Sequence, residues 1–322
     1  MDIYIYTHNW PESTKGKLTL NSTYKDTAGN LGPSATTGLF DIDTRAPTVN
    51  VFSLANTPLL NGQTTTVNLI FSEPIDGSTF NSNDDITVVN GSLSLMTSND
   101  NKSWSGTFTP TADIEDSTNI LTLQTGSIND VLGNPLGDQV FTSNFIIDTL
   151  KPTVVAFTLT DTALKAGDTA TVDLVFSEAV SGFSSDVDIN THGIGSLSTM
   201  TSSNDINWTG TFTPSTDLSG GTTNILTLNN TYTDLLGNTG VSITTSQFAI
   251  DTLPVSVLTF TLSDTSLKSG DTATVTLNFS EPIDTNTFSL STIDSSGGIL
   301  SNLLTSDNKD WTFTFTPTTD LE

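Results

Sequence analysis

Three glutamates occupy one repeated position of the sequence. Glu73, Glu178 and Glu281 each follow a Phe-Ser pair, although the 322 residues hold only six glutamates. An Asp-x-x-Gly-Asn motif also recurs, and it supplies Asp130 with Asn134 and Asp234 with Asn238. Carboxylate and amide oxygens are the ligands that calcium prefers in proteins. The chemistry that these positions indicate is the binding of a hard cation.

The residues that catalysis needs are sparse. His8 and His192 are the only histidines, and neither recurs between repeats, so no repeated base is available for a Ser-His-Asp arrangement. The run Asp294-Ser295-Ser296-Gly297 is similar to an aspartic-protease loop but lacks a glycine directly after the first serine. Paired carboxylates can hydrolyse glycosides, but a pair that recurs in every repeat is typical of a structural site. We expect a non-enzymatic protein.

Charge and composition exclude several classes of partner. The net charge of -26 opposes binding to nucleic acid phosphates or to an anionic membrane surface. The chain has no Cys, which rules out disulfides and thiolate metal sites. No apolar run reaches the roughly 18 residues of a membrane helix, so we expect no membrane insertion. The first ten residues do not read as a signal peptide, and we expect any export signal and anchor to lie outside this chain.

The sequence repeats with a period near 104 residues. Phe71-Ser72-Glu73 returns 105 residues later and again after a further 103, and Trp104, Trp208 and Trp311 keep their distance from a Phe-Thr-Pro triplet. A period of this length is the size of a domain, not of a solenoid repeat. The predicted units are residues 1–44, the end of a repeat; 45–149 and 150–252, two complete repeats; and 253–322, the first two thirds of a repeat.

Each unit is expected to be a β-sandwich. Apolar and polar residues alternate along 155–159 and 170–176, and about seven such short stretches fill each complete repeat without a helical period. Thr is the commonest residue and favours strands. The predicted fold class is all-β, with tandem immunoglobulin-like sandwiches of about 104 residues arranged as beads on a string. The Trp of each unit is expected in its core.

Four stretches of the second complete repeat carry a resemblance to a known family. They are Leu164-Lys165-Ala166-Gly167-Asp168-Thr169, Phe176-Ser177-Glu178-Ala179-Val180, Trp208-Thr209-Gly210-Thr211-Phe212-Thr213-Pro214 and Asp234-Leu235-Leu236-Gly237-Asn238. The chain resembles the tandem bacterial Ig-like repeats of large RTX-type surface adhesins and biofilm-associated proteins. The resemblance implies a long, secreted, calcium-dependent stalk. The chain lacks glycine-rich calcium nonapeptides and a separate ligand-binding domain, so we expect stalk only.

The strand order brings the repeated carboxylates together. In a seven-stranded sandwich, the loop after the second strand and the loop between the last two strands lie at one pole, where the preceding unit also ends. Converging carboxylates repel one another unless a cation lies among them. The predicted calcium ligands, grouped by junction, are Asp43, Glu73, Asp130 and Asn134; Asp148, Glu178, Asp234 and Asn238; and Asp251 with Glu281. The alternative is that Asp-x-x-Gly-Asn is only a turn, held by local hydrogen bonds and a glycine with positive φ.

The leading interpretation is a structural spacer segment of a secreted bacterial cell-surface adhesin, stiffened by calcium and supporting adhesion or biofilm formation. A glycan- or protein-binding module and an accessory region of a secreted hydrolase are the alternatives. The expected partners are neighbouring repeats, together with head-to-tail self-association in which residues 1–44 complete the sandwich begun by residues 253–322. The junctions are not expected to be equivalent, because Asp43 and Asp148 precede a Pro by four residues and Asp251 by three.

Overall fold

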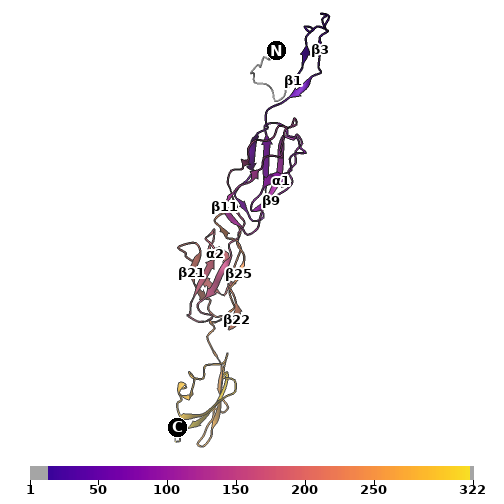
Figure 1. Ribbon diagram of the computed structural model, residues 1–322. Helices are drawn as coiled ribbons and strands as arrows, with labels where there is room; N and C mark the ends of the chain where they lie inside the picture. The colour runs from indigo at the N-terminus through magenta and orange to yellow at the C-terminus, as the bar shows by residue number, and fades with distance from the viewer. Residues whose placement is uncertain (1–13, 320–322) are drawn as a thin grey trace.

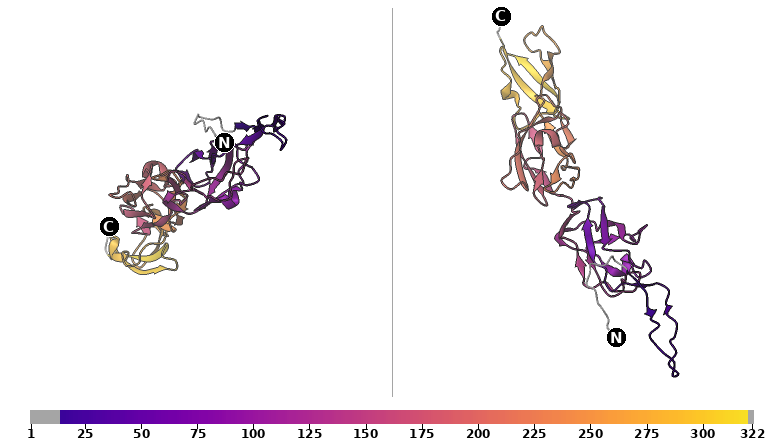
Figure 2. Two further views of the ribbon diagram at one scale, coloured as in Figure 1. Left: turned by 45° about the horizontal axis from the view of Figure 1, so that its top comes forward. Right: turned by 90° about the horizontal axis from the view of Figure 1, so that it is seen from above.

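The computed structural model describes residues 14–319, so the expectations for His8 and for residues 320–322 lie outside the described residues. The units follow one another in a row, from a hairpin segment at the N-terminal end to an open sheet at the C-terminal end (Figure 1). The row is also seen in the two further views (Figure 2). Among residues 14–319, no helix is long and apolar enough to cross a membrane.

The first complete unit is a sandwich of one four-stranded sheet against two three-stranded sheets. The four-stranded sheet has the order β5 (Val49–Leu54), β7 (Thr65–Phe71), β10 (Ser103–Pro110), β9 (Gly91–Leu93). The other two have the orders β11 (Glu115–Asn119), β14 (Phe145–Asp148), β6 (Leu59–Leu60) and β13 (Val140–Phe141), β12 (Thr122–Leu123), β8 (Ile86–Thr87). The β14–β6 pair is parallel, and the other pairs are antiparallel.

The second complete unit repeats this arrangement. Its four-stranded sheet has the order β15 (Val154–Leu159), β17 (Ala170–Phe176), β21 (Asn207–Pro214), β20 (Gly195–Leu197). Two three-stranded sheets face it. One has the order β16 (Ala163–Lys165), β26 (Phe248–Asp251), β22 (Gly221–Asn224), and the other has the order β19 (Ile189–Asn190), β23 (Thr227–Leu228), β25 (Ile243–Thr244). A further two-stranded sheet pairs β18 (Val180–Ser181) with β24 (Thr233–Asp234). The repeat in sequence is thus a repeat in topology.

The two end segments are simpler. The first pairs β1 (Thr14–Gly16) with β4 (Phe40–Ile42) and β2 (Thr19–Leu20) with β3 (Ala35–Thr36). The last is one sheet of β27 (Val257–Leu262), β28 (Ala273–Phe279), β30 (Asp310–Pro317) and β29 (Gly298–Thr305), with a short 3₁₀ turn at Leu290–Thr292.

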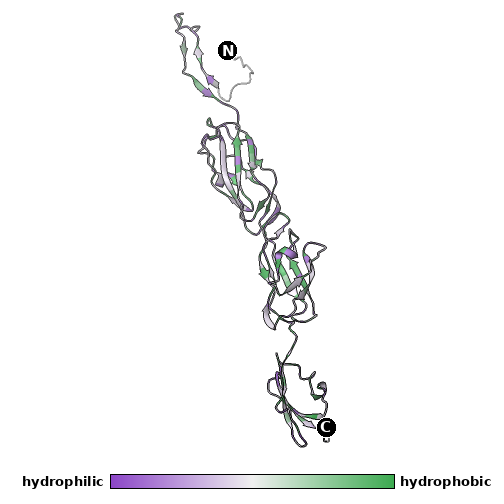
Figure 3. Cartoon of the chain, turned by 180° about the vertical axis from the view of Figure 1, so that it is seen from behind, coloured by the Kyte–Doolittle hydropathy of each residue, from purple (hydrophilic) through white to green (hydrophobic). Residues whose placement is uncertain are grey.

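Strand alternation builds the core, and Figure 3 shows apolar residues along the strands of each unit. Along β7, Val67, Leu69 and Phe71 are fully buried while Thr66 faces solvent. Trp104 and Trp208 are half-buried against the two complete cores, and Trp311 is buried in the last unit. The predictions of an all-β fold and of a core Trp are confirmed.

Two one-turn helices depart from the expectation of strands alone. They are α1 (Ser82–Asp85) and α2 (Ser185–Asp188). A carboxylate closes each turn, because Asp85 accepts the N–H of Asn81 and Asp188 accepts the N–H of Ser184, both at 2.7 Å. A helix of four residues is too short to leave an apolar period in the sequence.

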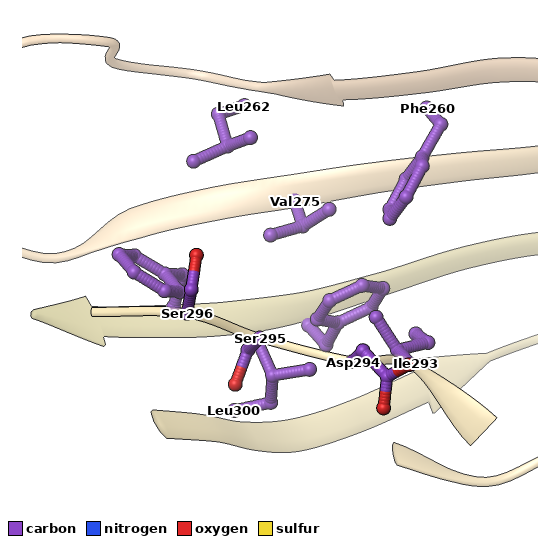
Figure 4. A pocket seen from close by; sticks show the side chains of 10 residues that line it. Phe260, Leu262, Val275, Ile293, Asp294, Ser295, Ser296 and Leu300 are labelled. Carbon is purple, nitrogen blue, oxygen red and sulfur yellow. The ribbon is translucent and has the colours of Figure 1, made fainter. Parts of the chain in front are cut away.

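The core face of the last sheet is only partly covered by described residues: Phe288, Leu290 and Ile293 pack against it, whereas Phe260 and Leu262 of β27 stay exposed. In the complete units Phe108 packs edge-on against Phe145, and Phe212 against Phe248. The corresponding Phe315 has no such ring over it among residues 14–319, and it lines an apolar hollow of about 260 Å³ (Figure 4).

Candidate metal centres

A hydrogen-bonded turn builds the Asp-x-x-Gly-Asn loop. Asp234 Oδ1 accepts the backbone N–H groups of Leu236, Gly237 and Asn238 at 2.9, 2.6 and 2.9 Å. Gly237 has a φ of +114°, a conformation that glycine adopts without strain. Asp130 accepts equivalent bonds from Leu132 and Asn134 at 2.8 and 2.9 Å. The loop therefore fixes each Asp by purely local chemistry.

Strand pairing brings the loop to the glutamate. In the second unit, β18 follows Glu178 and pairs with β24, so that Val180 lies opposite Asp234. In the first unit, Ile75 and Asp130 form the equivalent bridge. The preceding segment ends at the same pole, and the structure brings Asp43, Glu73 and Asp130 together with their ligand atoms within 4.8 Å of one another. Glu73 and Asp130 are buried, and Asp43 is half-buried.

The second junction gathers carboxylates that repel one another. Burial and then the charge of Asp234 raise the pKa of Asp148 above its usual value. Burial raises the pKa of Glu178 as well, reinforced by Asp234, Asp148 and Glu115 in that order. Glu178 Oε1 is a buried oxygen without a hydrogen-bond partner. Such an oxygen beside like charges is costly in the absence of a cation.

Glu115 is a member of this group that the sequence analysis missed. It lies opposite Asp148 in the β11–β14 register, and its side chain is exposed. Glu115 is not shared by the two complete repeats, since the corresponding residue of the next unit is Ser219. The scarcity of glutamates in the chain was the signal that could have drawn attention to it.

The two predicted asparagine ligands act as tethers. Asn238 Nδ2 donates to Asp234 Oδ2 at 2.7 Å and to the main-chain oxygen of Asp148 at 3.0 Å. Asn134 does the same with Asp130 at 2.6 Å and with Asp43 at 3.2 Å. Each amide thus points a donor at the cluster and joins the loop to the end of the preceding segment, at Asp148 in β14 or at Asp43 directly after β4. Ligation by an amide oxygen of either residue stays a prediction.

The third predicted pair is the least developed. Asp251 is exposed and Glu281 half-buried. Within residues 14–319, neither belongs to a group of three or more potential ligands. No loop of the Asp-x-x-Gly-Asn type follows them in the sequence.

The turn alternative accounts for part of the geometry. Asp26 accepts the N–H groups of Ala28 and Asn30 at 2.9 and 2.8 Å, and Asn30 Nδ2 donates to it at 2.8 Å. This loop is exposed, so the turn forms without a carboxylate cluster. Local bonds also explain Asp130. Burial raises the pKa of its carboxyl, but the hydrogen bonds from Asn134, Leu132 and Gly133 lower it by more, so the pKa is lowered overall. They leave the repulsion around Glu178 unexplained.

The donor set suits calcium. Three carboxylates from three separated segments, with main-chain oxygens beside them, form the oxygen-rich surroundings that calcium takes with six to eight ligands. At the second junction the unpartnered Glu178 Oε1 supplies a position where a cation would replace a missing donor. The residues present therefore fit the ion.

The catalytic alternatives find less support in the geometry. Asp294, Ser295 and Ser296 line the apolar hollow of Figure 4, where Asp294 is the only carboxylate among the lining residues. Ser295 donates to the main-chain oxygen of Gly298 at 3.0 Å, which makes this segment a turn. His192 lies in a loop with a φ of +52°, and its Nε2 is 2.9 Å from Thr227 Oγ1.

Comparison with known proteins gives one family. A family model described as a bacterial Ig-like domain matches residues 43–146, 148–250 and 251–322. No curated protein matches the chain. Among solved structures, a marsupial T cell receptor matches at 12% sequence identity, covering 82% of this chain and 92% of the receptor chain. Its TM-score is 0.28, and no conclusion is based on it.

Proposed function

The chain belongs to the bacterial Ig-like domain family, and on that premise we propose that it is a spacer segment of a secreted bacterial cell-surface adhesin, stiffened by calcium at its junctions. Its task in this proposal is mechanical, because it holds an adhesive region away from the cell and so supports adhesion or biofilm formation. The adhesive region, the export signal and the anchor belong to other parts of such a protein.

The tandem arrangement supports the spacer role. The units stand in a row, one after another along the chain (Figures 1 and 2). An acidic surface with a net charge of -26 disfavours collapse of the row on itself and binding to anionic lipids. These properties suit a rod more than an enzyme.

The observation that carries the calcium proposal is Glu178. Its Oε1 is buried without a partner beside two further buried carboxylates, Asp148 and Asp234. Burial first and then like charges raise the pKa values of Asp148 and Glu178, and a divalent cation there would neutralise the like-charge repulsion. It would also connect consecutive units, since Asp148 ends one unit and the other two belong to the next.

Thermal unfolding in calcium and in EDTA tests the proposal. Extracellular modules bind calcium with Kd values near 10⁻⁴ to 10⁻³ M, so about 2 mM calcium should stabilise one site by up to about 1.8 kcal/mol. Magnesium at the same concentration serves as the control, because it demands a stricter octahedral geometry. Isothermal titration calorimetry gives the number of sites. A melting temperature that is equal in calcium and EDTA would contradict the calcium part of the proposal.

A further inference from the structure

A turn of the first complete unit contacts the second unit directly. The backbone N–H of Asn61, in the turn between β6 and β7, donates to Asn238 Oδ1 at 2.7 Å across 177 residues of sequence. Gly237 lies close by, since a Cβ placed on it would be 3.4 Å from Leu60 Cδ1. The turn therefore meets the Asp-x-x-Gly-Asn loop of the following unit through a hydrogen bond, with Leu60 beside Gly237.

The side chain of Asn61 fixes the start of the linker between the two complete units, residues 149–153. Its Nδ2 donates to the main-chain oxygen of Thr149 at 2.9 Å. Thr149 is itself held, because its hydroxyl donates to Thr111 O at 2.8 Å and accepts the N–H of Ile114 at 3.0 Å. The turn around Asn61, the linker between the units and the loop of the following unit are thus joined in one hydrogen-bonded network.

The orientation of the Asn238 amide follows from this network. Its Nδ2 meets two acceptors, Asp148 O and Asp234 Oδ2, and its Oδ1 meets one donor, Asn61 N. A flipped amide would place oxygen against two oxygens and nitrogen against a donor. Asn238 is 3% exposed, so its polar atoms need these partners.

The other units carry a different residue at this turn position. Ala166 corresponds to Asn61 in the second complete unit and Ser269 in the last. Ala166 has no side-chain amide that could donate to a main-chain oxygen of the next linker, as Asn61 does to Thr149 O. Among the described residues, no hydrogen bond joins 150–252 to 256–319. Residues 253–322 also contain no Asp-x-x-Gly-Asn motif, so the two junctions differ both in the turn residue and in the loop that would accept it.

We infer that the turn around Asn61 is a docking element for the Asp-x-x-Gly-Asn loop of the following unit, and that it fixes this junction without a metal ion. The partner is a neighbouring repeat with an Asn at the end of that loop. The inference rests on the proposed spacer function, because a fixed angle between the two complete units is what a stiff spacer needs. The contact itself depends on no bound cation.

Distances between spin labels in two consecutive units of the full chain test the inference, because the width of their distribution reports how firmly the junction is held. The chain has no Cys, so introduced cysteines are the sole label sites. Thr66, Thr171 and Thr274 are exposed at the same position of β7, β17 and β28. Cysteines at 66 and 171 report the junction with Asn61, and cysteines at 171 and 274 report the junction with Ala166. Both pairs are measured by pulsed electron resonance in EDTA.

The expected result is a narrow distance distribution for 66/171 and a wide one for 171/274. Asn61→Ala, the residue that the second unit already carries there, should widen the 66/171 distribution toward that of 171/274. Thr64→Ala is the matched control, because Thr64 is exposed just after the turn and does not line the hollow between the turn and the Asp-x-x-Gly-Asn loop. It should leave the width unchanged.

Two outcomes would overturn the inference, namely equal widths for the two pairs in EDTA or an Asn61→Ala variant as narrow as the parent. Neither outcome touches the calcium proposal, which the thermal and calorimetric titrations decide. Conversely, a chain that binds no calcium but keeps the narrow 66/171 distance would retain the docking element and lose the calcium sites.

Discussion

Glu178→Gln should change stability in opposite directions with and without calcium. Gln keeps the volume of Glu178 and removes its charge. In EDTA this removes both the cost of burying a charge, which is the main cause of the raised pKa of Glu178, and the repulsion from Asp234 and Asp148. In calcium the variant lacks one proposed carboxylate ligand, so the stabilisation by the ion should fall.

The geometry sets the scale of both effects. Two full charges 4.8 Å apart, the spacing that bounds the first-junction carboxylates, repel by about 3.5 kcal/mol at an effective dielectric constant near 20 and by about 0.9 kcal/mol in water. The carboxylates of the second junction do not form so close a group, so these values set only the order of magnitude for Glu178. Because Glu178 is half-buried, we expect a gain of about 1 to 2 kcal/mol in EDTA. For a unit of this size, about 1 kcal/mol corresponds to a shift of roughly 4 °C or more in melting temperature. In 2 mM calcium, up to about 1.8 kcal/mol of ion binding would be lost.

The assay is differential scanning calorimetry of the full chain in both buffers. Glu281→Gln is the matched control, since Glu281 occupies the same position of its repeat but no Asp-x-x-Gly-Asn loop follows it in the sequence. It should leave both melting curves nearly unchanged. A Glu178→Gln variant that melts below the parent in EDTA would show that the carboxylate stabilises the metal-free junction, and the electrostatic reasoning would be refuted.

Three further outcomes are expected. In EDTA, the urea midpoint should rise as the pH falls from 7.5 to 5: the pKa values of Asp148 and Glu178 are raised in the folded chain, so folding takes up protons there and stability is lost as the pH rises through them. Below about pH 4 the trend should reverse, because groups with lowered pKa values such as Asp307 become protonated; a midpoint that falls steadily from pH 7.5 to 5 would count against this. Trp208→Ala should cost about 3 to 5 kcal/mol through lost burial and a cavity, measured by urea unfolding, whereas Glu178→Ala should leave its unit folded. Finally, we propose that copies of the chain associate head to tail, because Phe40 and Ile42 of β4 are exposed while the last sheet presents the hollow around Phe315; size-exclusion chromatography should show association that grows with concentration and disappears in a chain trimmed to 45–252, and a chain that stays monomeric at high concentration would end this proposal.

The fold could be predicted from the sequence because its signals are repeated. Alternation along 170–176 and the recurring Trp specify strands and a core, and each repeat supplied an independent copy of the same pattern. The two one-turn helices escaped prediction because four residues carry no periodicity. Their only sequence signal is an Asp placed to accept the N–H of the residue before the turn, such as Asp188 for Ser184.

The candidate site was predictable in its position and less so in its chemistry. Strand order alone indicated that Asp43, Glu73 and Asp130 approach one another, and the structure brings them within 4.8 Å. The direction of an amide group cannot be read from a sequence, so only the structure shows that Asn238 Nδ2 donates to Asp148 O and Asp234 Oδ2, while ligation by its amide oxygen stays a prediction. Glu115 and Asn61 escaped notice because each occurs in only one of the two complete repeats, and a search for shared columns discards such residues.

The parallel pairing of β6 with β14 and of β16 with β26 bears on how the chain carries tension. In each complete unit, a segment near the beginning lies beside the last strand and runs in the same direction. A pull on the two ends draws these neighbours past one another, so their hydrogen bonds are loaded together in shear and do not open one at a time. The force that a unit withstands then depends on its unfolding rate constant more than on its equilibrium free energy of unfolding. A row of such units would act as a set of mechanical fuses in series, in which the unit whose shear pair yields first limits the force that reaches the others.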